Sequence, residues 1–551
     1  MPSFKSDARV VFLLAVVVFG SVVFAQDAPR FSESIDVSLV NVEVIVTDRK
    51  GERVRGLKAS DFTILEEGKR QEIVNFAEYA GERGTLEVGV ENADTRADQN
   101  SVPRQPRTII VFVDELALAA SPTDIRPALR ETLRAALEPG DVGAVLSWTR
   151  SLKMRQGFTD DVDALTQAID ALPSRGAVFN DAQWRQKMRE SDAFWRAAMN
   201  DPRNAGAGRL GPPSSGFTDS YAVMAMMDVK AKTLAIKAAM TAMAGAEGRK
   251  IMLLVTHRLS RHSGREYTLS ARATAEDMRQ SDPRYDSLRT IESIAETANS
   301  TGFTIYGLYP EGMPATFDSA ENGQLLTASS GAIGVRDHII LMNETESLAL
   351  VTKRTGGKFA IGADTLKLLP RVNEDLSDYY SLAYRTPARG TDNRRRISVR
   401  VKNRDYEVRT RSEYVERSDD TRMKERVVSS VFGNIDPGVI PVEAEVGAIG
   451  PKKTVPLTIR IPISALTTLQ EDGKHAGKFT VFVSWSSSGL SGDVTKNTQP
   501  FTIAAADLER AKGSHFTYNY EVKFDRGAPI LGVGVMDETS KEFGVTTVRV
   551  R

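Results

Sequence analysis

Two adjacent carboxylates, Asp114 and Glu115, follow the apolar run IIVFV at residues 109–113. An apolar run without alternation is typical of a strand that is buried on both faces of a parallel sheet. In α/β proteins the end of such a strand is a common place for a ligand or a metal ion. Carboxylate oxygens there could bind a hard cation such as Mg²⁺, or they could act as a general acid and base.

Catalysis by this pair alone is disfavoured by its spacing. General acid–base catalysis needs two carboxyl groups that flank a substrate in different environments, whereas adjacent residues at a strand end point in different directions. The sequence also contains neither an H-E-x-x-H zinc helix nor a G-x-S-x-G nucleophile turn. His257 and His262 could suggest a metal pair, but we expect both on the surface or in a loop.

The composition excludes several classes of site and partner. The 551 residues include no cysteine, which rules out disulfides, thiolate metal sites and a cysteine nucleophile. Lys+Arg and Asp+Glu are both 72, so the formal net charge is zero and nothing indicates a nucleic-acid partner. The length predicts about three domains.

The N-terminus is typical of a signal peptide over residues 1–25. Lys5 and Arg9 precede an apolar run that is short for a membrane-spanning helix. We expect cleavage between Ala25 and Gln26, export to the periplasm or the cell exterior, and no stable membrane span afterwards. An uncleaved membrane anchor is the alternative.

The rest of the chain divides by pattern into a β segment, a linker, an α/β region and a second β segment. The α/β region alternates strands and helices, which predicts a doubly wound, mostly parallel, Rossmann-like sheet with helices on both faces. Two of its strands, at 142–148 and 151–158, are joined so closely that we expect antiparallel pairing. The predicted boundaries are 31–80 for a small β domain, 81–106 for the linker, 107–415 for the α/β domain with insertions at 174–218 and 311–343 and a hairpin at 386–415, and 427–551 for the second β domain.

Two finer patterns lie within these segments. Residues 427–551 contain about seven strand-like runs separated by Gly, Asn and Asp turns, which predicts an immunoglobulin-like β-sandwich. In the first insertion, Trp184, Met188, Trp195 and Met199 share one helical face. Aromatic stripes usually pack into a core, so we expect this helix to pack on its own domain, with a lid or a partner-docking helix as the alternative.

Several stretches resemble the von Willebrand factor A (vWFA)-related proteins of the acidobacterial type. They are VEVIVTDRKGERVRGLKASDFTILEEGKRQEIVNF, the long stretch that begins IIVFVDELALAASP, and the later GRKIMLLVT, TGGKFA and DLSDYYSLAYRTP. The resemblance covers roughly residues 31–415 and rests on the order of the stretches more than on one motif. It implies a vWFA-like core that carries a small β unit in front.

The resemblance also implies a Mg²⁺ site with the pattern Asp-x-Ser-x-Ser, which this chain departs from. Asp114 takes the first position, but Leu116 and Leu118 stand where the two serines belong. Thr256-His257 stands where an acid is expected after the fourth strand of the domain. Asp114, Glu115 and Thr256 remain as residual metal candidates, together with Ser121 as an oxygen donor, so we expect no bound metal or other cofactor and leave Mg²⁺ open as the alternative.

Without a metal, the acidic pair has a simpler interpretation. Asp114 and Glu115 would form a solvated strand end that caps the following helix and interacts with its N-terminus. Ser121 would cap the next helix, with Pro122 in its first turn.

The function that follows is an exported, non-enzymatic, adhesion-type protein that binds another protein. The candidate binding residues are Asp114, Glu115, Ser121, Thr256, Trp184 and Trp195. An exported hydrolase and a structural envelope protein are the two alternatives. The sequence indicates neither the partner nor the oligomeric state.

Overall fold

The computed structural model of the chain describes most residues from Val37 onward. Described are residues 37–81, 83–88, 101–103, 105–174, 215–264, 283–311, 328–387, 390–433, 435–450, 453–471, 473–487, 490–491, 493–524 and 527–550. The predicted signal peptide at 1–25 lies outside these ranges. So do Trp184 and Trp195, together with most of the predicted insertion at 174–218.

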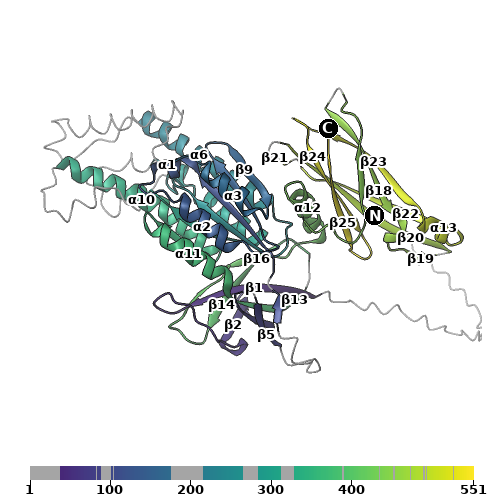
Figure 1. The fold of residues 1–551 in the computed structure, drawn as a ribbon, viewed down its shortest axis with the longest axis horizontal. Helices are drawn as coiled ribbons and strands as arrows, with labels where there is room; N and C mark the ends of the chain where they lie inside the picture. Colours follow the sequence, from purple (N-terminus) through teal and green to yellow (C-terminus); the bar gives the residue numbers. More distant parts are fainter. Residues whose placement is uncertain are drawn as a thin grey trace, which may run out of the picture. The chain divides into compact units, whose positions relative to one another are not determined.

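A mostly parallel sheet forms the centre of the α/β region, as the sequence predicts (Figure 1). Its strand order is β12-β11-β10-β7-β8-β9. Every neighbouring pair is parallel except β8 and β9, and the antiparallel pairing expected for these two is confirmed. The strands are β7 (Arg107–Asp114), β8 (Val142–Trp148), β9 (Leu152–Thr159), β10 (Arg249–Val255), β11 (Phe303–Tyr309) and β12 (Phe359–Ile361).

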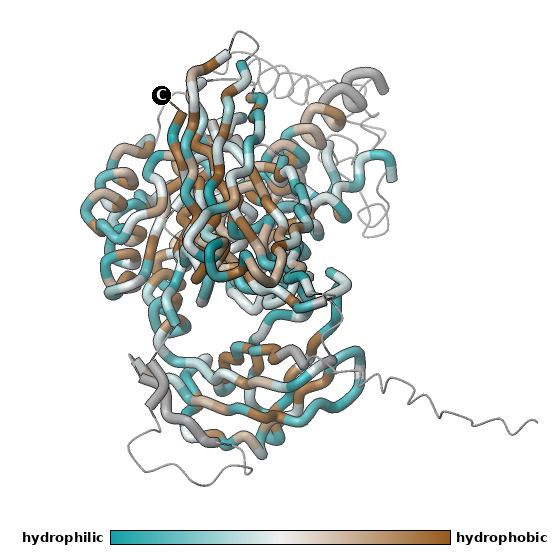
Figure 2. The backbone as a smooth tube through the Cα atoms, turned by 90° about the vertical axis from the view of Figure 1, so that its right-hand side faces the viewer, coloured by the Kyte–Doolittle hydropathy of each residue, from teal (hydrophilic) through white to brown (hydrophobic). Residues whose placement is uncertain are grey.

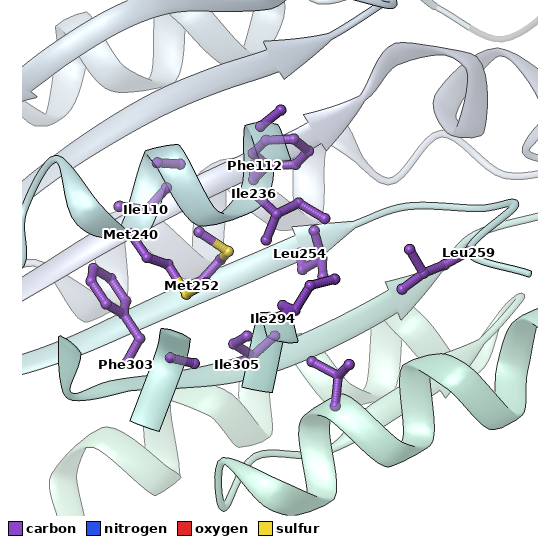
Figure 3. Packing of buried hydrophobic residues seen from close by; sticks show 14 of the residues in the cluster. Ile110, Phe112, Ile236, Met240, Met252, Leu254, Leu259, Ile294, Phe303 and Ile305 are labelled. Carbon is purple, nitrogen blue, oxygen red and sulfur yellow. The ribbon is translucent and has the colours of Figure 1, made fainter. Parts of the chain in front are cut away.

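Helices cover both faces of this sheet, because the buried strands are apolar on both sides. One face packs against α6 (Ser215–Thr241), α9 (Leu288–Thr301) and α10 (Ala328–Arg354). Figure 3 shows this layer, in which Ile236 and Met240 of α6 lie over Met252 and Leu254 of β10. The other face packs against α1 (Glu115–Ala120), α2 (Arg126–Ala136), α3 (Val162–Asp170) and α11 (Asp364–Ser377).

The small β unit draws its strands from two distant parts of the chain. One sheet has the order β15-β1-β13-β4-β5-β6 and another has the order β16-β14-β2-β3. Their strands are β1 (Val37–Thr47), β2 (Phe62–Glu66), β3 (Lys69–Gln71), β4 (Ile73–Ala80), β5 (Arg83–Val88), β6 (Ser101–Pro103), β13 (Asp378–Pro387), β14 (Arg394–Val401), β15 (Glu407–Arg409) and β16 (Glu413–Val415).

This pairing differs from the predicted arrangement in two respects. Within residues 386–415, expected as a hairpin of the α/β domain, β14 pairs antiparallel with β16, but strands of this segment also pair with β1 and β2. Part of the predicted linker at 81–106 forms β5 and β6. The physical reason is the shared core: Val40, Val42, Val44 and Val46 of β1 are buried and share a core with residues of β13 and β14. The segment predicted as a domain, 31–80, therefore does not close a core alone. Hydrophobic and hydrophilic stretches alternate along these strands in the lower part of Figure 2.

The C-terminal region consists of a helix and two antiparallel sheets. Helix α12 (Asp419–Ser430) ends inside the segment that was expected to be all β. One sheet is β17-β18-β23, and the other is β19-β20-β24-β25 with β21 and β22 also paired to β20. Both sheets contribute to one apolar core. The strands are β17 (Glu443–Val446), β18 (Thr454–Pro462), β19 (Leu469–Glu471), β20 (Lys474–Ser487), β21 (Leu490–Ser491), β22 (Thr495–Ala504), β23 (His515–Lys523), β24 (Ile530–Asp537) and β25 (Phe543–Arg549), with the short helix α13 (Leu508–Lys512) before β23.

The predicted second insertion also differs from expectation, since α10 already begins at Ala328, within 311–343. Across the described helices, none has both the length and the apolar character that crossing a bilayer requires.

Candidate functional site

The carboxyl ends of β7 and β10 lie side by side at the point where the order of the strands in the sheet reverses. The chain passes from β7 to β8 on one side, and from β10 to β11 on the other. In open α/β sheets this reversal leaves a crevice at the carboxyl edge, which is the usual ligand position. Asp114 is the last residue of β7, and Thr256-His257 directly follows β10.

Asp114 is fully buried, and each of its two carboxylate oxygens has at least one polar partner. One oxygen, Oδ1, accepts a hydrogen bond from the backbone N–H of Leu116 at 3.1 Å, so Asp114 caps α1. The other, Oδ2, lies 2.6 Å from Nζ of Lys232 and 3.1 Å from Nδ1 of His257. The capping role agrees with the prediction, whereas the predicted solvated position is wrong.

Lys232, which the sequence analysis did not single out, reaches this strand end from α6. Its side chain is 2% exposed, and its Nζ also donates a hydrogen bond to the His257 carbonyl oxygen at 2.7 Å. Asp228, one turn earlier on α6, stands 4.0 Å from the same nitrogen. The ammonium is therefore held by two close oxygens, those of Asp114 and the His257 carbonyl, with Asp228 farther away.

The sequence did contain a signal for this lysine. Lys232 lies three residues after Val229 and four before Ile236, so it falls on the buried stripe of α6. A lysine on such a stripe is almost never buried without a partner.

The neighbours of Asp114 keep its carboxyl ionised although it is buried. Burial alone would raise the pKa of the Asp114 carboxyl, because desolvation disfavours the charged form. The ammonium of Lys232, and after it the ring of His257, outweigh that effect and hold the pKa of Asp114 well below its ordinary value of 3.8.

Thr256 and His257 complete this cluster. The hydroxyl of Thr256 is buried and donates to the His257 carbonyl oxygen at 3.2 Å, the same oxygen that Lys232 contacts. His257 lies in the loop after β10, which is one of the two expected positions, and its side chain is buried. Its contact with Asp114 joins residues that are 143 positions apart in the chain.

The other two predicted residues, Glu115 and Ser121, face different surroundings. Glu115 is buried against Arg155 of β9, whose Nε also donates to Ser147 Oγ at 2.8 Å, so its predicted solvated position is wrong. Ser121 was expected to cap the start of the helix that follows it, and this prediction is wrong. Ser121 is the C-cap of α1, and α2 begins five residues later, at Arg126. Its hydroxyl instead lies 2.6 Å from the Thr123 carbonyl oxygen.

A second buried acid lies beside the cluster and was missed by the sequence analysis. Glu344 of α10 accepts hydrogen bonds from the backbone N–H of Arg258 at 2.6 Å and from the Tyr309 hydroxyl at 3.0 Å. Burial raises the pKa of the Glu344 carboxyl, and burial together with Glu344 raises the pKa of Tyr309. Glu344 lies far from Asp114 in the sequence, and no local pattern indicates that the two acids lie at the same edge of the sheet.

A cavity of about 250 Å³ opens above the Asp114 cluster. Two of its lining residues, Arg150 and Arg258, have positive backbone φ angles of 77° and 52°. Non-glycine residues rarely adopt that conformation, and where they do so it often marks a binding or switch region. The lining residues are Asp114, Leu116, Trp148, Arg150, Met224, Met227, Asp228, Ala231, Lys232, His257 and Arg258.

The residues at this strand end do not fit a divalent cation. Leu116 and Leu118 offer no oxygen where the metal pattern needs hydroxyls. Asp114 already holds the ammonium of Lys232 at 2.6 Å, and Glu115 is paired with Arg155, so a further cation beside either carboxylate would be repelled. In the described ranges, no group of three or more His, Cys, Asp or Glu residues is arranged to hold a metal ion.

The sheet order, the helix layers and the site at the reversal point define a doubly wound α/β domain. No protein-family profile and no curated protein sequence matches the chain. Among solved structures, the chain is similar to BatB from Bacteroides thetaiotaomicron, with 9% identity, 50% of this chain and 98% of that chain covered, and a TM-score of 0.21.

Two further solved structures concern pili. One is a mutant of the PilB minor pilin from Streptococcus sanguinis, with 9% identity, 61% and 87% coverage of the two chains, and a TM-score of 0.25. The other is the vWF domain of the type V pili tip protein Mfa5 from Porphyromonas gingivalis, with 11% identity, 50% and 95% coverage, and a TM-score of 0.20. At such TM-scores the assignment of the fold rests on the sheet order and the helix layers described above.

Proposed function

We propose that this chain is an exported, non-enzymatic binding protein of the vWFA type, which contacts another protein through the carboxyl edge of its central sheet. The cavity at the reversal point of the sheet carries this proposal. The cavity lies where open α/β sheets bind ligands. Met227, which lines it, is 61% exposed. Methionine is an adaptable contact residue at binding surfaces.

The charges around the cavity favour an acidic partner segment. Three cationic residues, Arg150, Lys232 and Arg258, line it together with two acids, Asp114 and Asp228. The lining therefore holds one more cationic side chain than acidic ones, and within it the Lys232 ammonium pairs with Asp114. A partner segment that combines an acidic and an apolar side chain complements this lining.

The contacts of the acidic pair support a binding protein over a hydrolase. A general base needs a carboxylate oxygen that is free to accept the proton of the attacking group. Both Asp114 oxygens already accept from donors, and Glu115 is buried against Arg155. The alternative function, a structural envelope protein, is supported only by the two packed C-terminal sheets. We also propose that these two sheets form an immunoglobulin-like sandwich.

Site-specific photo-crosslinking tests the proposed binding face. A photoreactive phenylalanine analogue at Met227 should crosslink one protein in envelope extracts, and the same analogue at Leu234 should not. Leu234 is a matched control, because it lies on the same helix and is 66% exposed but does not line the cavity. Charge reversal by R150E together with R258E should abolish the Met227 product, whereas equal labelling from both positions would contradict the proposal.

Export is tested separately on the natural chain. A C-terminally tagged protein should appear in the periplasmic or extracellular fraction with Gln26 as its first residue, as read by N-terminal sequencing. Retention of an intact N-terminus in the membrane fraction would support the uncleaved anchor instead.

A further inference from the structure

The ammonium of Lys232 occupies the position that any cation bound by Asp114 would have to take. Its Nζ lies 2.6 Å from Asp114 Oδ2 and 2.7 Å from the His257 carbonyl oxygen. One oxygen belongs to the last residue of β7 and the other to the loop directly after β10, and these two strands border the reversal point of the sheet. The lysine therefore bridges the same two strand ends that a bound ion would join.

The surrounding residues suit an ammonium better than a metal ion. An ammonium carries three N–H donors and needs a few acceptors, whereas Mg²⁺ requires six oxygens in near-octahedral geometry. Asp114 and the His257 carbonyl supply two acceptors, and Leu116 supplies an apolar wall of the cavity where a hydroxyl would otherwise stand. An aliphatic wall suits the methylene stem of a lysine.

We propose that Lys232 is a built-in cation that replaces a bound metal at the end of β7, so that the domain keeps this edge of its sheet in one arrangement with or without divalent ions. A cation attached covalently to α6 cannot be removed by chelation, and its position depends on the packing of that helix. This inference goes beyond the proposed binding function, since it concerns how the site is held and not what it binds.

Chemical rescue provides the direct test. K232A removes the atoms of n-propylammonium, so it leaves Asp114 buried with a vacant space of that shape. The thermal midpoint of the full mature chain should fall by roughly 10 °C, because a buried carboxylate loses its main partner. Added n-propylammonium should restore several degrees of this loss at millimolar concentrations, whereas n-propanol and Mg²⁺ at matched ionic strength should not.

Two controls keep the rescue specific. The thermal midpoint of the wild type should be unchanged by n-propylammonium, because the Lys232 side chain already fills the space that K232A vacates. In the double variant D114N/K232A, the rescue should disappear, because the carboxylate that attracts the cation is gone.

A measurement on the unmodified protein decides the matter if K232A does not fold. Calorimetric titration of Mg²⁺ and Mn²⁺ into the wild type should give no saturable heat. Saturable heat that is lost in D114N would overturn the proposal, because it would place a metal at the same oxygen. Equal rescue by propanol and by propylammonium would also overturn it, since the effect would then come from filled volume alone.

Discussion

At the residue scale, the distinctive feature of this protein is a carboxylate that is fully buried and yet ionised. Burial of an unpaired charge is costly, and it is tolerated when the charge is paired and hydrogen-bonded. Asp114 meets this condition through Lys232, His257 and the backbone of Leu116. Its role is thus first to hold two strand ends and a helix together.

The substitution D114N should lower the free energy of unfolding by about 3 kcal/mol at pH 7, because it leaves Lys232 buried without its counter-charge. The folded pKa of Asp114 lies below its ordinary value of 3.8, so its contribution is present above pH 3.8 and declines as the pH falls further. The difference between wild type and D114N in urea unfolding should therefore shrink toward pH 2. D405N, at an exposed acid paired with Arg49, should show little change at either pH; a D114N effect that does not vary with pH would contradict the pairing.

Glu344 should show the opposite dependence on pH. Its folded pKa is raised above the ordinary 4.5, so the folded state holds its proton longer than the unfolded chain does. Stability contributed by the neutral form is therefore lost as the pH rises from 4.5 toward and through the raised value. E344Q, which retains an acceptor for the Arg258 N–H and for the Tyr309 hydroxyl, should remove this slope when unfolding is measured between pH 4.5 and 8. An unchanged slope would assign the pH dependence to other groups.

At the scale of elements, helix α6 determines the site, because it supplies both the apolar layer over the sheet and the cation at the end of β7. Its buried stripe includes Val229, Ile236 and Met240, and Lys232 is the charged member of the same stripe. The register of α6 on the sheet therefore sets the position of the ammonium relative to Asp114.

Two neighbouring positions on α6 separate packing from surface effects. I236A should destabilise the protein by about 3 kcal/mol, because it removes a fully buried side chain and leaves a cavity beside β10. L234A, two residues earlier and 66% exposed, should change stability by less than about 0.5 kcal/mol. Both values come from denaturant unfolding curves, and similar losses for the two variants would mean that α6 is not packed as described.

At the scale of the whole molecule, buried arginine–acid contacts join the central sheet to the small β unit. Arg409 of β15 contacts both carboxylate oxygens of Asp375 on α11, at 2.9 and 2.8 Å, and Arg53 pairs with the same acid. The Tyr306 hydroxyl of β11 donates to Asp375 at 2.8 Å. Arg249, at the start of β10, likewise pairs with Glu43 of β1 at 2.7 Å.

The substitution D375N should lower the free energy of unfolding by about 3 kcal/mol, because it removes the carboxylate that pairs with the buried Arg409 and the partly buried Arg53. D364N is the matched control, since Asp364 begins the same helix but is exposed and pairs only with Lys367 among the contacts described. Limited proteolysis should cleave the strands of the small β unit faster in D375N than in D364N. Equal cleavage rates would indicate that Asp375 does not join the two units.

Several elements were predictable from the sequence because their signals are local. The apolar run of β7 predicted a strand buried on both faces, and the short connection between β8 and β9 predicted their antiparallel pairing. Asp114 at the strand end was also predictable as a helix cap. Each of these inferences needs only a few consecutive residues and the geometry of a strand, a turn or a helix end.

The remaining features depend on contacts between distant segments. The strands at 378–415 join β1 and β2 because the small β unit needs them to close its core, which no local pattern states. The position of Lys232 on the apolar stripe of α6 indicates a buried lysine with some partner, but only the packing of α6 on the sheet makes that partner Asp114.

The sequence by itself therefore determined the alternation of strands and helices in the α/β region, the absence of cysteine chemistry and the leucines at positions 116 and 118. The tertiary structure alone decided which charges meet at the end of β7, where the ammonium of Lys232 lies against Asp114. The physical reason is that secondary structure follows from periodicity over a few residues, whereas a buried ion pair forms only when folding brings separate segments together in a medium of low dielectric constant.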